Sequence, residues 1–278
     1  MDAKLQRRIQ RYGWDKAIAA YEAGWKESLS DAHDELLRQA KAETGESVLD
    51  IACGTGLITL RLAEAVGPKG CMTATDLSEN MVSELGETAE ALGFANITAF
   101  RADAEDLKAV PDDSMDLVTC ALGLMYVPHP ERAMAEALRI LKPGGRAVMA
   151  VWGARRKCGW AEIFPIVNAR VQSDVCPLFF RLGTGETLSH EMSAAGFSQV
   201  MSKRIDSVLS YRDDKSAIDA AFVGGPVALA YDRFDDATRA SATKEYLASI
   251  RSFSTPDGYR IPGEFVVCSG VKTTEKPI

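Results

Sequence analysis

A glycine-rich turn and an acidic residue further along the chain have the types and spacing suited to binding a nucleoside. The apolar run VLDIACGTG (residues 48–56) leads from a strand-like stretch into a glycine turn and then into a helical pattern. Glycine lacks a Cβ and tolerates positive φ, so the backbone of such a turn can approach a ligand, while the helix behind it offers free N–H groups. Asp76 ends the next apolar run, twenty residues past Gly56. A carboxylate at this place can accept both hydroxyls of a ribose.

The same two features occur in proteins that bind dinucleotides, so an NAD-dependent oxidoreductase is an alternative interpretation. The dinucleotide fingerprint is G-x-G-x-x-G. Here the third glycine is absent, because residues 57–59 are LIT, and the two glycines crowd onto the end of the strand behind Asp50. The pattern therefore favours a nucleoside that carries no pyrophosphate.

The elements that would position these residues alternate regularly between residues 45 and 152. Short apolar runs predict five strands, and the stretches between them predict helices that end at signals such as Gly67-Pro68. Strands that are apolar throughout and alternate with helices indicate an α/β fold, a parallel sheet covered on both faces with right-handed crossovers. The expected strands are 47–52, 71–76, 96–102, 114–122 and 146–152, and the expected helices are 57–66, 78–93 and 131–141.

The two ends of the chain add helices and two late strands to this sheet. Residues 1–44 read as helical, and strands at 200–211 and 263–271 are expected to pair in antiparallel fashion at the edge of the sheet. We therefore expect an N-terminal helical segment (1–44) and one α/β domain (45–278). Two insertions in that domain, at about 153–185 and 213–256, are expected to cover the substrate.

Composition excludes several classes of protein. The 278 residues are 46% hydrophobic and 26% charged, which excludes a disordered chain and a disulfide scaffold. The net charge of −7 makes a nucleic-acid partner unexpected. The six scattered cysteines form no CxxC pair, no apolar run approaches the length of a membrane span, and the start of the chain lacks the pattern of a secretory signal. We expect a cytoplasmic protein with free thiols, no membrane span and no metal site.

Four motifs in order resemble class I S-adenosylmethionine-dependent methyltransferases. The first is D-x-A-x-G-T-G (50–56) with the acidic end of the next strand, although Ala52 stands where the family usually has the first glycine of G-x-G-x-G. The others are ADAE (102–105), SMDLVT (114–119) and LKPGG (141–145). Over about residues 45–152 the chain is most similar to the ubiquinone/menaquinone C-methyltransferase-like group of small-molecule enzymes. The resemblance implies a Rossmann-like, mostly parallel sheet of seven strands. The cofactor would be S-adenosylmethionine and the product S-adenosylhomocysteine.

The resemblance also assigns cofactor roles to residues at the strand ends. Asp50 is expected to orient the glycine loop, Asp76 to hold the ribose hydroxyls and Asp103 to read the adenine edge. The full set expected to bind the cofactor is Asp50, Ala52, Gly54, Gly56, Asp76, Leu77, Asp103, Ala104, Ala121 and Leu122.

The loop after the fourth strand, GLMYVPHP (123–130), is expected to face the methyl acceptor, because the carboxyl ends of parallel strands face the ligand crevice. Tyr126 and His129 are the candidate catalytic residues. His129 could act as a general base, since the ordinary pKa of histidine is near 6.5, and a solvent-exposed loop histidine is the alternative. The residues expected to bind the acceptor are Met125, Trp152, Trp160 and Tyr21.

The expected activity is methyl transfer, by in-line displacement, to a small and partly apolar acceptor. Methylation of O, N, S or C stays open, and a nucleic-acid acceptor is unexpected because ALGL (121–124) replaces the D/N-P-P-Y/F/W motif of base-methylating enzymes. In related enzymes a segment such as 1–44 closes over the cofactor as a lid, and a helix packed on the sheet is the alternative. An NAD-dependent oxidoreductase and a non-catalytic cofactor-binding partner protein remain as alternative functions.

Overall fold

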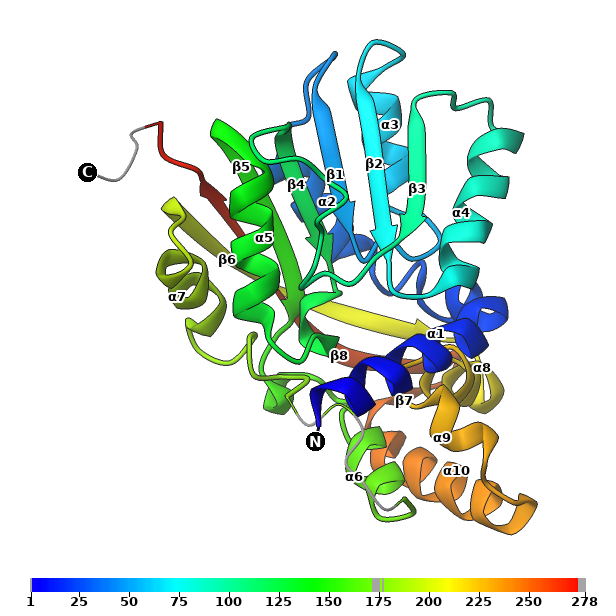
Figure 1. The fold of residues 1–278 in the computed structure, drawn as a ribbon. Coiled ribbons are helices and arrows are strands. Elements are labelled where there is room, and N and C mark those ends of the chain that lie inside the picture. Colours follow the sequence, from blue (N-terminus) through cyan, green and yellow to red (C-terminus); the bar gives the residue numbers. More distant parts are fainter. Residues whose placement is uncertain (1, 172–175, 177, 275–278) are drawn as a thin grey trace.

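The computed structural model describes residues 2–171, 176 and 178–274 and contains one mixed sheet at its centre (Figure 1). Five parallel strands form one side in the order β3-β2-β1-β4-β5, and β8 and β6 extend the sheet in antiparallel fashion. The strands are β1 (Ser47–Ile51), β2 (Cys71–Asp76), β3 (Ile97–Arg101), β4 (Met115–Ala121), β5 (Leu141–Trp152), β6 (Ser198–Tyr211), β7 (Ser254–Thr255) and β8 (Gly258–Val271). The mostly parallel α/β sheet predicted from the sequence is confirmed.

Two strands differ from the sequence-based expectation. The strand β5 begins at Leu141, so the KPGG run that was expected to precede it lies within it, where Gly144 N–H donates to the Lys272 carbonyl. The antiparallel pairing expected for the two late strands at the edge of the sheet is confirmed, since β6 pairs with β8, and β8 also pairs with β5. The two-residue β7 was missed because it pairs only across a tight turn with β8.

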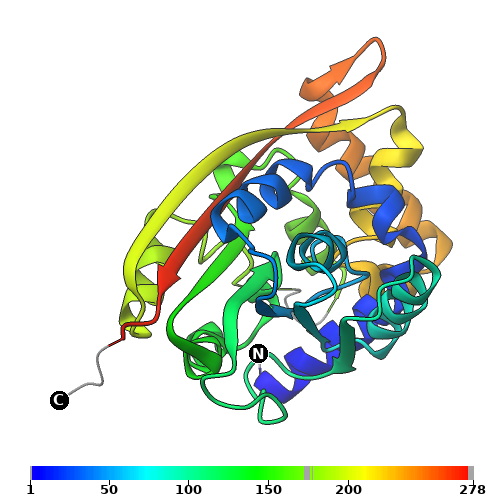
Figure 2. The same ribbon diagram turned by 90° about the horizontal axis from the view of Figure 1, so that it is seen from above.

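Helices cover both faces of the sheet, as the alternating pattern predicts (Figure 2). On one face α2 (Ser30–Ala40) and α3 (Thr59–Val66) bury Leu36 and Leu62 against strand residues such as Val48. On the other face lie α5 (Pro130–Ile140) and α7 (Thr187–Ala194), whose Met134 and Met192 belong to the larger core. The helix α4 (Glu79–Ala91) packs beside β2 and β3.

The remaining helices gather at the carboxyl ends of the parallel strands (Figure 1). The longest of them is α1 (Ala3–Trp25), which a turn separates from α2, so the segment expected to be helical contains two helices with different neighbours. The others are η1 (Leu124–Tyr126), η2 (Arg155–Lys157), α6 (Ile163–Asn168), α8 (Asp214–Ile218), η3 (Asp219–Val223), α9 (Ala228–Asp232), α10 (Asp236–Ile250) and η4 (Arg251–Phe253). Residues 172–175 and 177 of the expected insertion 153–185 lie outside the described residues.

The helix α1 packs against η3 and α9 through small residues and one indole. Gly24 lies against Ala220, where an added Cβ would come within 3.0 Å of the Ala220 Cα. Trp25 Nε1 donates to the Ala220 carbonyl at 3.1 Å. The first helix and the region 213–256 are therefore in contact over the strand ends. The boundary expected between residues 44 and 45 stays a prediction.

A buried carboxylate ties β1, β4 and α3 together beneath those strand ends. Asp50 is 1% exposed, and its two oxygens accept hydrogen bonds from the hydroxyls of Thr59 (2.7 Å) and Thr119 (2.8 Å). Burial raises the pKa of Asp50 to about 6, against the lowering effect of both hydroxyls. Each carboxylate oxygen thus already has a partner from the protein itself.

Gly56, the last glycine of the turn, has a packing role. Its φ is +96°, and a Cβ at this position would overlap Leu85 Cδ1 of α4. Close contact between the glycine turn and α4 requires this residue to be glycine, independently of any ligand.

Gly56→Ala is expected to lower the free energy of unfolding by about 2–4 kcal/mol, from backbone strain and overlap with Leu85. The matched control is Gly86→Ala. Gly86 lies on the exposed face of α4 with open space around its Cα, so alanine there should stabilise the protein by up to about 1 kcal/mol. Urea unfolding checks both variants, and equal midpoints for the two would contradict this account of Gly56.

Asp50→Asn is expected to remove one pH-dependent contribution to stability. Between about pH 4 and pH 6 the folded protein holds a proton on Asp50 that the unfolded chain has released, so stability falls as the pH rises through this window. The contribution is about 3 kcal/mol in total and constant above pH 6. The measurement is urea unfolding of both proteins from pH 4 to pH 7. The difference isolates Asp50, because His33, whose pKa burial lowers to about 4, titrates in both. Parallel stability curves would refute this assignment.

Candidate functional site

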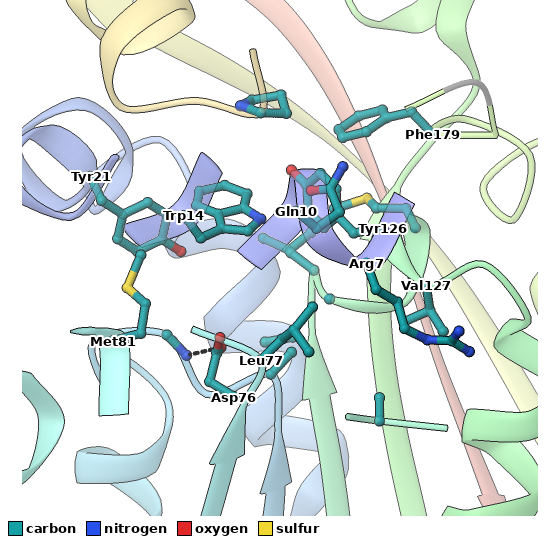
Figure 3. A pocket seen from close by; sticks show the side chains of 18 of the residues that line it. Arg7, Gln10, Trp14, Tyr21, Asp76, Leu77, Met81, Tyr126, Val127 and Phe179 are labelled. Atoms are coloured by element: carbon teal, nitrogen blue, oxygen red, sulfur yellow. Dashed lines mark hydrogen bonds between the residues drawn. The ribbon is translucent and has the colours of Figure 1, made fainter. Parts of the chain in front are cut away.

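A cavity lies between α1 and the carboxyl ends of β1, β2 and β4 (Figure 3). Its empty volume is about 1000 Å³, a figure that includes the space at the open mouth. Thirteen of the sixteen site residues expected from the sequence line it. They are Ala52, Gly54, Asp76, Leu77, Asp103, Ala104, Ala121, Leu122, Met125, Tyr126, Trp152, Trp160 and Tyr21.

The loops after β1 and β4 approach each other closely at the floor of this cavity. Ala52 and Leu122 both adopt the left-handed backbone conformation, with φ of +56° and +61°. Side chains rarely occupy this region, and such strain is typical of functional loops. Gly123 lies so close to Ala52 that a Cβ on it would overlap the Ala52 side chain. The left-handed backbone conformation of Ala52 is one that a glycine at this position would adopt without strain.

Asp76 holds the glycine turn from the end of β2. Its Oδ2 accepts the Gly54 N–H at 3.0 Å and its Oδ1 accepts the Ser78 N–H at 2.8 Å. Burial raises the pKa of Asp76, while these N–H groups act in the opposite direction. A carboxylate offers about four lone-pair sites, so Asp76 retains acceptor capacity for a hydroxyl in the cavity. Ser78 in turn caps α4 by accepting the Met81 N–H.

The residues after β3 meet the first helix across the cavity. Asp103 Oδ1 accepts the Glu105 N–H at 3.0 Å, and Oδ2 lies 2.6 Å from Arg7 Nε. Arg7 also forms an ion pair with Glu105. The acidic group expected to read an adenine edge is thus partly neutralised by a cation that sequence reasoning did not connect with it.

The other end of the cavity is walled by aromatic rings from three segments. Trp14 of α1 lies edge to face with Tyr126 at 5.2 Å between ring centroids, and Tyr126 with Phe179 at 5.4 Å. Phe179 then contacts Trp160 at 5.6 Å, and Trp160 contacts Trp152 at 4.8 Å. The insertion after β5 therefore contributes to the same wall as the first helix.

Tyr21 and Tyr126 both line the cavity, and their hydroxyls form no hydrogen bond with the residues that the structure describes. Burial raises the pKa of Tyr21, with a further rise from the charge of Asp76, and burial raises the pKa of Tyr126. Both groups therefore stay protonated near neutral pH, where each is a hydrogen-bond donor to whatever fills the cavity.

Three of the expected site residues lie outside the cavity lining. Asp50 and Gly56 lie beneath it, in the contacts described above. His129 stands just before α5, with its side chain 40% exposed and its Nδ1 3.3 Å from Glu131 Oε1. Its neighbour Pro128 lines the cavity. Proximity in sequence to Tyr126 therefore did not bring the His129 ring into the lining.

Twelve lining residues are not among the sixteen expected from the sequence, and they include Arg7, Gln10, Met81 and Pro226. The first two had a readable signal. Arg7, Gln10, Trp14, Tyr21 and Trp25 are spaced three, four, seven and four residues apart, which places them on one face of a helix. That face mixes charge, amide and aromatic groups, so it does not stand out as an apolar stripe.

Within the described ranges, no three His, Cys, Asp or Glu side chains are grouped so that they could hold a metal ion. In the same part of the chain, no helix combines the length and apolar character needed to cross a bilayer.

Comparison with known sequences points to one kind of domain. A family model described as a methyltransferase domain matches residues 48–145. The demethylmenaquinone methyltransferase of Listeria welshimeri is 33% identical over 130 residues, which cover 47% of this chain and 55% of that protein. The match thus spans about half the length of the curated relative.

Comparison with solved structures shows the fold. The [4+2]-cyclase SpnF superposes with a TM-score of 0.61 at 22% identity, covering 92% of this chain and 84% of that one. The phosphoethanolamine N-methyltransferase 2 of Haemonchus contortus, in complex with S-adenosyl-L-methionine, gives a TM-score of 0.59 at 18% identity, covering 93% and 57%. These proteins share the Rossmann-like sheet with the present chain.

The motifs between Asp50 and Gly145, the strand order and the match over residues 48–145 agree with one another. Residues 48–145 match a methyltransferase domain, carried on a Rossmann-like sheet.

Proposed function

We propose that this protein transfers the methyl group of S-adenosylmethionine to a small, partly apolar acceptor held in the cavity under α1. The observation that carries the proposal is Asp76. It lies at the end of β2, anchors the Gly54 turn, lines the cavity and retains acceptor capacity beyond the backbone N–H groups that it already accepts. A nucleoside ribose presents the pair of hydroxyls that such a carboxylate accepts.

The residues at the strand ends fit the remaining parts of this cofactor. Gly54 has a φ of +55°, and an added Cβ would find only Tyr21 Cε1, at 3.9 Å, so the turn is open on its cavity side. Leu77 offers an apolar surface for the adenine, and Asp103 and Ala104 offer polar groups at its edge. Ala121 and Leu122 would flank the methionine chain.

The bound cofactor supplies a methyl group on a positively charged sulfur. A nucleophile of the acceptor attacks the methyl carbon in line with the carbon–sulfur bond, and the sulfur leaves. The protein's own part is alignment and exclusion of water. Holding nucleophile, methyl and sulfur in line is worth about 7–11 kcal/mol of the barrier. The close approach of Gly123 to Ala52 and the cover of α1 provide a rigid floor and roof for that alignment.

The wall suits an acceptor with an apolar, flat part. Trp14, Trp152, Trp160 and Phe179 present ring faces and edges, and Met125 adds a polarizable side chain. The hydroxyls of Tyr21 and Tyr126 can donate to an oxygen of the acceptor. The names of the curated relatives make a quinol-like ring the first acceptor to test.

Hydride transfer with NAD is the competing function. The turn lacks the third glycine of the dinucleotide fingerprint, and its Gly54 N–H is hydrogen-bonded to Asp76. The turn therefore does not have the glycine spacing that accommodates a pyrophosphate. Titration calorimetry of the stripped protein with S-adenosylhomocysteine, with NAD as the second titrant, decides between the two. Micromolar binding of the first and none of the second supports methyl transfer, and the reverse result overturns it.

Asp76→Ala is expected to weaken S-adenosylhomocysteine binding by about 5-fold to 150-fold, or about 1–3 kcal/mol, because buried ligand hydroxyls lose a charged acceptor. Asp76→Asn keeps an oxygen for the Gly54 N–H and should fall between Ala and wild type. Asp106→Ala, in the exposed loop after β3, is the control and should leave the affinity unchanged. Calorimetry that returns equal affinities for Asp76→Ala and wild type would remove Asp76 from the site.

His129→Ala is expected to lower turnover for an acceptor that must lose a proton, because an imidazole next to the cavity-lining loop can act as a general base. Tyr126→Phe is the companion variant, since it deletes a hydroxyl that faces the cavity and leaves the wall intact. Labelled S-adenosylmethionine and a panel of phenols, quinols and amines provide the assay. An unaltered rate and pH profile in His129→Ala would exclude His129 as the base.

A further inference from the structure

A buried carboxylate, Glu105, joins three segments at the edge of the cavity. Its side chain is only 3% exposed. One oxygen, Oε1, accepts a hydrogen bond from the backbone N–H of His129 at 3.1 Å. The other oxygen forms an ion pair with the Arg7 guanidinium. The loop after β3, the loop before α5 and the helix α1 therefore meet at this one group.

Arg7 bridges Glu105 and Asp103. Its guanidinium carries the positive charge for both carboxylates, and Arg7 and Asp103 line the cavity directly. Without Arg7, two carboxylates would stand next to each other, one of them buried, with backbone N–H groups as their remaining partners. A buried charge that loses its partner is strongly destabilised in place.

The first two turns of α1 reach the loop after β4 a second time. Gln6 Nε2 donates to the Tyr126 carbonyl at 3.2 Å. That loop carries Tyr126 into the aromatic wall and follows Leu122 at the cavity floor. The position of α1 and the position of Tyr126 are thus coupled through Gln6, Arg7 and Glu105.

We propose that Arg7 and Glu105 are positioning residues that form a latch, and that the latch sets how tightly the cavity holds the cofactor. This inference rests on the proposed function. With the latch closed, α1 already covers the cavity and the Tyr126 loop is already in place, so binding requires little further ordering. With the latch broken, only a fraction of molecules has α1 in place, and the apparent affinity falls by that fraction.

The chain offers a matched control at the next position. Arg8 is exposed and forms no ion pair or hydrogen bond with any part of the chain that the structure covers. Arg7→Met and Arg8→Met remove the same charge from the same helical turn. Only the first removes the contact with Glu105, so a difference between them does not arise from net charge or helix propensity.

The experiment measures S-adenosylhomocysteine affinity by calorimetry and backbone hydrogen exchange in residues 3–25 and 123–129. Arg7→Met should weaken binding at least tenfold and speed exchange in both segments of the ligand-free protein, whereas Arg8→Met should change affinity less than twofold. Arg7→Lys keeps the positive charge but lacks the planar guanidinium that can contact two carboxylates, so it should lose less affinity than Arg7→Met. Arg7→Met combined with Glu105→Gln should lose little more than Arg7→Met alone, because both changes break one contact.

Unchanged affinity in Arg7→Met, or losses that add fully in the double variant, would overturn the latch. Arg7 is partly exposed, so Arg7→Met should fold even if Glu105→Gln does not, and urea unfolding checks this. The exchange measurement needs no ligand. A wild-type protein that binds no S-adenosylhomocysteine overturns the proposed function, while exchange in α1 still decides whether Arg7 holds the helix.

Discussion

The site depends on the close approach of the loops that leave β1 and β4. The Cα of Gly123 lies where a side chain would collide with Ala52, and both Ala52 and Leu122 take the left-handed backbone to make that approach. Beneath them Asp50 joins the same two strands through the hydroxyl of Thr119. A shift of either strand would open the cavity floor. The buried Asp50 contacts therefore support ligand binding without needing to touch the ligand.

The cavity has two kinds of surface, a floor and a roof. The roof is built from segments that are far apart in the sequence. The floor comes from strand ends, whose spacing the hydrogen-bonded sheet determines. The roof comes from α1, Pro226 and the insertion that carries Trp160 and Phe179. Helix packing, such as Gly24 against Ala220, and ring contacts determine its shape. Acceptor preference can thus change by substitution in the roof while the cofactor surface stays the same.

This division explains how much could be predicted from the sequence. Apolar runs bounded by glycine and proline predicted the five parallel strands, and residues at strand ends were found because the topology brings those ends together. Arg7 and Gln10 were missed because nothing local indicates where α1 lies relative to the sheet. His129 follows a lining residue by one position, but its ring lies beside Glu131 and outside the lining, so its role as a base stays a prediction. The start of β5 was misplaced because Gly144 and Gly145, which read as a turn in the sequence, pair with Lys272 just after β8.

The fold and the reaction are separate questions for this architecture. A chain described as a [4+2]-cyclase shares the sheet at a TM-score of 0.61, so strand order by itself is compatible with more than one chemistry. What argues for methyl transfer is the combination of the domain match over residues 48–145 with a carboxylate at Asp76 that still has lone pairs facing the cavity. The acceptor surface is the aromatic wall, beside which the Tyr21 and Tyr126 hydroxyls have no hydrogen-bond partner in the described chain. Each hydroxyl can donate to an oxygen on an acceptor ring while the flat ring lies against the aromatic side chains, so oxygen-bearing rings are the first class to screen.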